Sequence, residues 1–303
     1  MVGDDAFVDT AIDGGRQNFF NETEVDIIGE AGYRTDGRDL IEEAMDAGVK
    51  VTQTADELTA LDLEKDDKVL ALFNPSHVRY EYDRETESPD ELSIMEMTKV
   101  AMNLLSKNPN GYYLMVEAGR VDHANHAGNL YRTFTDGVAY QEAIQYAMDN
   151  TDPAETLIIS TADHGHAISY HGYCGRGSSV TGLCMEIDPS GTIHGPKPNI
   201  ASDGNTYTVI SVGNGPGSIL YVSPQFHASG GPNFSNVTDE GTGVVIRPNV
   251  TEEESTDPDY IQQALVPMDS ETHSGADVVV YAQGPWSHLF VGTVEQTHIY
   301  DVM

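Results

Sequence analysis

Short apolar runs alternate with amphipathic segments along the first half of the chain. Ile94–Leu105 repeats apolar residues at a helical spacing, and Asp39–Ala47 is a second predicted helix, followed by Gly48 where helices commonly end. A longer helix is expected from near Val121 to about Met148. The predicted strands are Ala6–Ile12, Val69–Phe73, Tyr112–Val116 and Thr156–Ser160. Strands separated by helices predict an α/β fold with a mostly parallel central sheet flanked by helices.

The pattern changes between Gly172 and about Pro267, where Gly, Ser, Pro, Asn and Thr dominate and the helical periodicity disappears. The short strands predicted there are Tyr207–Val212, Ser218–Val222 and Gly243–Ile246. The sheet pattern resumes with Asp277–Ala282 and Leu289–Val294. We therefore expect an α/β core over residues 1–171, an inserted lobe over residues 172–267, and a return to the core over residues 268–303.

The chain of 303 residues carries 49 acidic and 15 basic side chains, which gives a formal net charge of −34. A field of this sign repels nucleic acids and anionic membrane surfaces, so neither is expected as a partner. No apolar run approaches the roughly 20 residues that span a bilayer, and the first residues do not resemble a signal peptide. The acidity fits a solvated surface, carboxylates that gather divalent cations, or the steering of a cationic substrate.

The only two cysteines, Cys174 and Cys184, have nine residues between them. This spacing is wrong for a zinc knuckle and is compatible with a local disulfide in an oxidising compartment. The sequence Asn-x-Ser/Thr, the acceptor for N-glycosylation, occurs at Asn21, Asn233, Asn236 and Asn249. These features favour an extracellular, cell-surface or periplasmic location.

Candidate metal ligands follow the predicted strand Tyr112–Val116. Glu117 comes at the carboxyl end of this strand, where ligands collect in open α/β sheets. If the next helix begins near Val121, Asp122 and His126 are four residues apart and share one helix face. A carboxylate and an imidazole at that spacing can bind one metal ion.

A second cluster follows the next predicted strand, where Asp163 and His164 offer an oxygen and a nitrogen, and His273 precedes a later strand. A single Asp-His pair is more often a cap or a turn than a metal site. Two such clusters at the ends of consecutive strands favour metal binding. Mixed Asp and His ligands suit zinc, and an all-oxygen position such as Glu117 suits magnesium. The residues therefore indicate a metal-dependent hydrolase acting on a phosphate ester or a related compound.

These motifs resemble those of alkaline phosphatases of the animal type. Val116–His126 is similar to the family's Glu-Gly-Gly-Arg-Ile-Asp-His-x-x-His segment, and Thr161–His166 to its Thr-Ala-Asp-His-x-His segment. Glu271–Val278 is similar to its Glu-Thr-His-x-Gly-x-Asp-Val segment. Supporting matches are Asp13-Gly14-Gly15-Arg16, Gly213-Asn214-Gly215-Pro216-Gly217 and Gly284-Pro285-Trp286-Ser287-His288-Leu289. The matches follow the family's order across nearly the whole chain.

The resemblance implies hydrolysis of phosphate monoesters through a phosphoserine, with zinc and magnesium as cofactors. The residues that it assigns to metals are Asp122, His126 and His273 for the first zinc, Asp163 and His164 for the second zinc, and Glu117 for magnesium. It places His123 and His166 behind the ligands, with His123 near the phosphate. The lobe over residues 172–267 would correspond to the crown region of animal-type dimers, which implies a homodimer.

The family's serine-nucleophile motif, Asp-Ser-Ala-x-x-x-Thr-Ala, does not occur in this sequence. We therefore expect the chain to correspond to the carboxyl-terminal portion of the catalytic fold, with no catalytic nucleophile of its own. It should bind zinc with little or no turnover unless the missing segment is supplied. Two other interpretations stay open: an inactive zinc-binding fragment or remnant, and a phosphodiesterase-like or sulfatase-like relative of the same superfamily.

Overall fold

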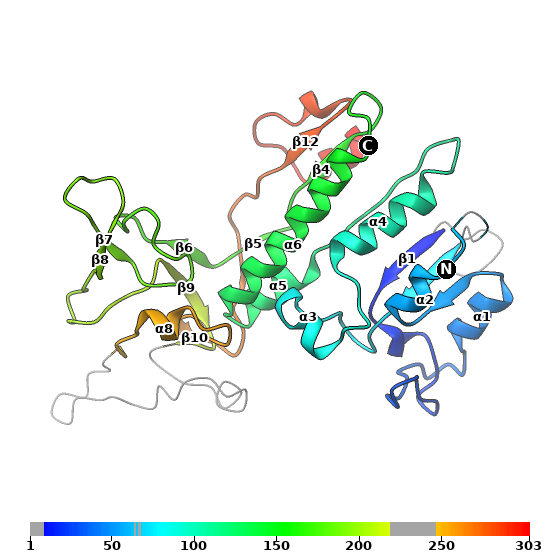
Figure 1. The fold of residues 1–303 in the computed structure, drawn as a ribbon, viewed down its shortest axis with the longest axis horizontal. Coiled ribbons are helices and arrows are strands. Elements are labelled where there is room, and N and C mark those ends of the chain that lie inside the picture. Colours follow the sequence, from blue (N-terminus) through cyan, green and yellow to red (C-terminus); the bar gives the residue numbers. More distant parts are fainter. Residues whose placement is uncertain (1–8, 64, 66–67, 219–246) are drawn as a thin grey trace. The chain divides into compact units, whose positions relative to one another are not determined.

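A computed structural model describes residues 9–63, 65, 68–218 and 247–303 (Figure 1). The chain divides into two compact units, the first formed by residues 1–120 and 135–158 and the second by residues 121–134 and 159–303. Helices α5 (Gly119–His126) and α6 (Leu130–Asp149) contain residues of both units. The predicted segment boundaries at residues 171 and 267 stay a prediction.

The first unit contains a three-stranded parallel sheet in the order β1 (Thr10–Asp13), β3 (Val69–Leu72) and β2 (Lys50–Thr52). All four residues of the central strand β3 are buried. Val69 and Ala71 belong to one hydrophobic cluster, whereas Leu70 and Leu72 belong to another. Since successive side chains of a strand point to opposite faces, both faces of the sheet are covered. This explains the uninterrupted apolar run and confirms the α/β class.

The helices of the first unit begin at residues that cap them. The side chain of Asp39 accepts the N–H groups of Ile41 and Glu42 in the first turn of α1 (Leu40–Asp46). Ser93 and Glu96 form a reciprocal capping box on α4 (Ile94–Leu105). Two further helices, α2 (Ala55–Thr59) and α3 (Glu81–Glu87), complete the α-helices that lie within this unit in the described part of the chain. The helices predicted over Asp39–Ala47 and Ile94–Leu105 are therefore confirmed.

Asp136, on the part of α6 that belongs to the first unit, is a buried carboxyl group. It accepts the backbone N–H of Glu81, at the start of α3, at 3.2 and 3.3 Å. Burial raises the pKa of Asp136 to about 6, although the Glu81 N–H and the Arg120 guanidinium both favour the charged form. Folding therefore favours the protonated form of this carboxyl group.

We expect Asp136→Asn to remove a pH dependence of stability. A carboxyl group whose pKa rises on folding lowers the free energy of unfolding as the pH rises from about 4 to about 6. Two pKa units correspond to about 3 kcal/mol at most. In urea unfolding, the free energy of unfolding of the variant relative to that of the wild type should increase by up to this amount as the pH rises from 4 to 7. Asp149→Asn, at an exposed position of α6, is the control, and equal pH profiles for the two variants would contradict the expectation.

The second unit is built from short strands in small sheets. Strand β9 (Ile210–Gly215) lies between β10 (Ala264–Pro267), which is parallel to it, and β6 (Ile168–Tyr170), which is antiparallel. The remaining pairs are β5 (Gly165–His166) with β11 (His273–Ser274), β7 (Met185–Ile187) with β8 (His194–Pro198), and β4 (Ile158–Ser160) with β12 (Tyr281–Gln283). The short helices α8 (Glu252–Ser255) and α9 (His298–Val302) follow later in the chain.

A disulfide between Cys174 and Cys184 closes a loop in this unit. Cys184 is fully buried and lies next to Leu183, which packs with Val250 and Tyr260 in a small hydrophobic cluster. The pairing that the sequence left open is therefore formed. Closing the loop restricts the unfolded chain and stabilises the fold that buries these residues.

The prediction of one continuous helix from near Val121 to about Met148 is wrong, because α5 and α6 are separate helices. Gly128 lies between them with a φ of +69°, a conformation that glycine adopts readily. A Cβ atom at this position would lie 3.2 Å from the side chain of Ile261, so the chain also approaches closely here. The break ends α5 directly after His126.

Two predicted strands are also wrong. Residues 112–116 form no regular strand, and Tyr113 and Met115 are 69% and 70% exposed. Leu289 ends a 3₁₀ turn over Ser287–Leu289, which follows Trp286 with its φ of +65°, and residues 290–294 form no regular strand. Three other strands are shifted along the sequence. The predictions were residues 156–160, 207–212 and 277–282, and the structure has strands at residues 158–160, 210–215 and 281–283, respectively. The strand predicted over Ala6–Ile12 is found as β1, which begins at Thr10, and residues 6–8 lie outside the described residues. Most of Ser218–Val222 and all of Gly243–Ile246 also lie outside the described residues.

Candidate metal centre

Three segments far apart in the sequence meet at the end of α5. Strands β5 and β11 pair antiparallel, with His166 opposite His273. The N–H of Glu271 donates to the carbonyl oxygen of His126 at 2.9 Å, and the N–H of Ala167 donates to that of Thr272 at 3.2 Å. These backbone bonds hold the imidazoles of all three segments near one another within the second unit.

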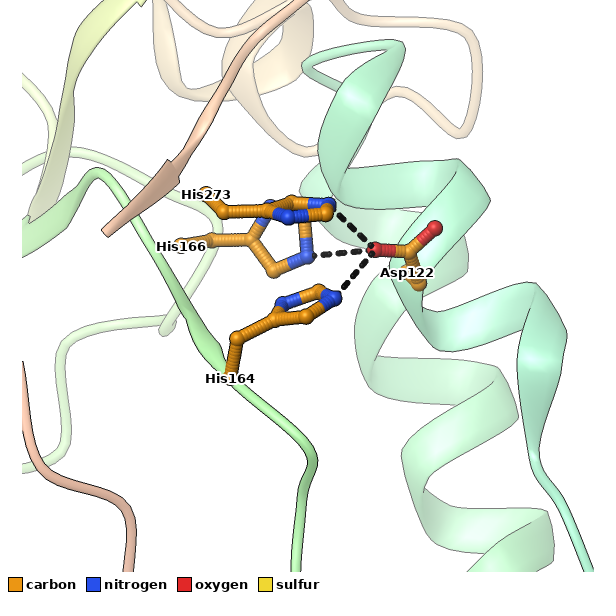
Figure 2. A group of neighbouring side chains, drawn as sticks. All are labelled: Asp122, His164, His166 and His273. Atoms are coloured by element: carbon orange, nitrogen blue, oxygen red, sulfur yellow. Dashed lines mark hydrogen bonds and ion pairs between the residues drawn. The ribbon is translucent and has the colours of Figure 1, made fainter. Parts of the chain in front are cut away.

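One oxygen of Asp122 lies at the centre of this group. Figure 2 shows three imidazoles directed at its carboxylate, those of His164, His166 and His273. Asp122 Oδ1 is 2.9 Å from His166 Nε2, 3.4 Å from His273 Nε2 and 3.9 Å from His164 Nε2. The rings of His164 and His273 stack with their centroids 3.4 Å apart. Four groups from α5, the turn before β5, β5 and β11 therefore converge on one point.

His126 completes the arrangement from the last turn of α5. Its Nε2 is 3.4 Å from Asp122 Oδ1, as expected for residues four apart on one helix face. Its Nδ1 donates to the carbonyl oxygen of Glu271 at 2.5 Å, which leaves Nε2 with an unshared electron pair. This nitrogen faces His273 Nε2 at 3.0 Å. Backbone contact thus fixes the tautomer in which His126 can bind a metal.

The donor atoms fit a zinc ion. Asp122 Oδ1, His126 Nε2 and His273 Nε2 form a triangle with sides of 3.4, 3.4 and 3.0 Å. Ligands of a tetrahedral zinc ion with bonds of 2.0–2.1 Å are separated by about 3.3–3.4 Å. Among the described residues, the buried His164 Nδ1 has no hydrogen-bond partner, whereas Nε2 of the same ring faces Asp122. Two nitrogens and a carboxylate oxygen at these separations are a donor set that suits zinc.

The structure brings some of the predicted site residues together and leaves another outside the group. Asp122, His164 and His273 share one potential metal-binding group with His166, which the sequence placed behind the ligands. Asp163 lies next to His164, with its Oδ2 3.3 Å from His164 Nε2, but its side chain is 77% exposed. The structure does not bring this carboxylate into the group around Asp122.

The two remaining predicted residues lie on or beside α5. His123 is half-buried on the helix, one residue after Asp122. Glu117 precedes the helix and belongs to the first unit. Their roles, support of the phosphate for His123 and magnesium binding for Glu117, stay predictions.

Glu271 is the residue that the sequence analysis missed. Its side chain is fully buried, and Oε2 lies 2.5 Å from His166 Nδ1. It also belongs to a second group of potential ligands with His126 and His166. The only available signal was its place two residues before His273 in the motif Glu271-Thr272-His273.

Comparison with known proteins identifies relatives along almost the entire chain. The family model for alkaline phosphatase matches residues 3–303. An alkaline phosphatase of Gadus morhua is 34% identical over 301 residues, which cover 96% of this chain and 56% of that protein. The tissue-nonspecific alkaline phosphatase of Gallus gallus is 35% identical over 303 residues, with 96% and 51% covered. The chain therefore spans about half the length of these curated relatives.

A solved structure supports the fold. A mutant of the TAB5 alkaline phosphatase, with Mg bound, superposes with a TM-score of 0.56 over 98% of this chain and 60% of that one, at 16% identity. In the described part of this chain, no helix combines the length and apolar character that crossing a membrane requires. The match of the family model over residues 3–303 confirms the resemblance read from the motifs. The chain belongs to the alkaline phosphatase family.

Proposed function

We propose that this chain provides the zinc-binding part of a metal-dependent phosphomonoester hydrolase. The observation that carries the proposal is the triangle of Asp122 Oδ1, His126 Nε2 and His273 Nε2, whose sides of 3.0–3.4 Å suit one tetrahedral zinc ion. Family membership supplies the reaction class. The family's serine motif is not in this sequence, so the proposal assigns no nucleophile to it.

The proposed roles follow from the residue types. Asp122, His126 and His273 would hold the first zinc ion, His164 and Asp163 would contribute to a second, and Glu117 would bind magnesium. Bound zinc lowers the pKa of a coordinated oxygen nucleophile and stabilises negative charge on a phosphoryl group. The chain's own contribution is orientation, because the Glu271 carbonyl fixes the His126 ring and backbone pairing places His273 opposite His166. His166 and His123 would support the ligands and the phosphate.

Assembly and location are further parts of the proposal. Residues 172–267 would form a lobe that contributes to a homodimer, by analogy with the crown of animal-type relatives. The disulfide between Cys174 and Cys184 supports an exported location, because disulfides persist in oxidising compartments. Phosphate monoesters would be the substrates.

Calorimetric titration of zinc into the metal-free chain tests the proposal, together with hydrolysis of p-nitrophenyl phosphate and bis(p-nitrophenyl) phosphate in zinc and magnesium. We expect at least one tight zinc site and little turnover by this chain alone. Adding a segment that carries the family's serine motif should produce hydrolysis of the monoester in preference to the diester. Failure to bind zinc would contradict the proposal, and preference for the diester would favour a phosphodiesterase-like relative.

A further inference from the structure

Glu271 is among the least exposed charged residues of the described chain, at 1% exposure. Both of its carboxylate oxygens have partners: Oε1 accepts the backbone N–H of Ala167 at 2.5 Å, and Oε2 contacts His166 Nδ1 at 2.5 Å. A buried carboxylate is stable only when such partners replace water. Because a carboxylate oxygen only accepts, His166 Nδ1 carries the hydrogen in this contact, and Nε2 must carry one as well where it donates to a second carboxylate.

The His166 ring connects Glu271 to Asp122. Its side chain is 7% exposed, and its second nitrogen, Nε2, lies 2.9 Å from Asp122 Oδ1. The ring therefore has a carboxylate at each end, and rotating it away from one breaks the contact with the other. Glu271 thereby determines how His166 meets the oxygen on which the other imidazoles converge.

The backbone of Glu271 is held as firmly as its side chain. Its N–H and carbonyl oxygen both bond to His126. The next residue, Thr272, exchanges two hydrogen bonds of 2.8 and 2.9 Å with the Asn214 side chain. A Cβ atom on Gly215, whose φ is +143°, would lie 3.3 Å from Glu271 Cβ, so glycine permits this close approach. The carboxylate therefore extends from a fixed point.

These contacts decide between two roles for Glu271. It lies near enough to His126 and His166 to share a metal ion with them, yet both oxygens are occupied inside the protein. We propose that Glu271 is a positioning residue, which fixes the His166 ring and through it the Asp122 carboxylate, and is not itself a ligand. The inference rests on the proposed zinc centre. Carboxylate partners of this kind typically change metal affinity 10- to 100-fold when they are replaced.

The test uses Glu271→Gln in the full chain, with zinc affinity measured by competition against a chelator. We expect affinity to fall 10- to 100-fold, because an amide cannot accept from both Ala167 N–H and His166 Nδ1–H. The absorption spectrum of bound Co²⁺ should change as well, since it reports ligand geometry. Unchanged affinity in a folded variant would overturn the proposal.

Glu91→Gln is the matched control. Glu91 is also 1% exposed, and its carboxylate accepts from the Asn74 amide at 2.5 Å and the Arg79 N–H at 2.7 Å, all within the first unit. The control should lose stability without losing zinc affinity. If it weakens zinc binding as much as Glu271→Gln does, the effect is general destabilisation and the positioning role is refuted.

A double-mutant cycle tests the path through His166. Once His166→Ala has removed the ring, adding Glu271→Gln should cause less than a twofold further loss of zinc affinity. Independent, multiplicative losses would overturn the proposal. The wild-type chain itself must bind zinc in these experiments, and its failure to do so would refute the proposed function and not the role of Glu271 alone.

A measurement on the unmutated protein covers the case in which Glu271→Gln does not fold. In the zinc-loaded chain labelled with ¹⁵N-histidine, we expect an Nδ1–H signal of His166 that exchanges slowly with water and disappears in His166→Ala. Absence of that signal from a zinc-loaded, folded wild-type chain would overturn the proposal.

Discussion

Asp122→Ala should weaken zinc binding by the chain at least about 100-fold. The variant removes an oxygen, Asp122 Oδ1, that lies within 2.9–3.9 Å of the ring nitrogens of four histidines. It removes a ligand and the negative charge that offsets the charge of the cation, so its effect should exceed that of replacing a residue behind the ligands. Calorimetric titration of zinc into the metal-free variant measures the loss.

Asp149→Ala is the control for this experiment, because Asp149 is exposed and lies on α6. Asp122→Asn should fall between the two, because it keeps the shape of the side chain and one oxygen while losing the charge. If Asp122→Ala binds zinc with wild-type affinity, the ion binds at a place that does not include the Asp122 carboxylate, which would contradict the proposed centre.

Removing zinc with a chelator should lower the melting temperature on the order of 10 °C. A ligand present at 1,000 times its Kd stabilises the folded state by about 4 kcal/mol, and each kcal/mol shifts the melting temperature by about 2–4 °C in a domain of 150–250 residues. Differential scanning calorimetry with and without zinc measures this shift.

The transition that moves should be that of the second unit, which contains Asp122, His126 and His273. In Asp122→Ala the chelator should have little further effect, because there is little bound zinc to remove. Equal melting temperatures for the zinc-loaded and the metal-free wild type would contradict the expectation.

Local signals predicted much of the first unit. The bounds of α4 agree with the sequence pattern because its capping box and its apolar spacing lie within a few residues of each other. Strand β3 was predictable because a continuous apolar run suits a strand that is covered on both faces. The spacing of Asp122 and His126 likewise predicted their shared helix face.

Features that depend on distant residues were not predictable. The role of Glu271 depends on Ala167 and His166, more than one hundred residues earlier in the chain. The residues near Tyr113 have the composition of a strand, but a strand also requires a partner for its backbone groups, which composition does not supply. The break at Gly128 depends on its close approach to Ile261.

The distance along the chain between His126 and His273 has a consequence for assembly. They are separated by 147 residues, so an ion bound by both acts as a cross-link that closes a very long loop. The entropy lost on closing a loop increases with its length. An ion that bound both histidines before the chain between them had folded would have to close this loop by itself. Capture of the ion should follow the docking of the intervening polypeptide, and metal starvation should leave newly synthesised molecules open to proteases.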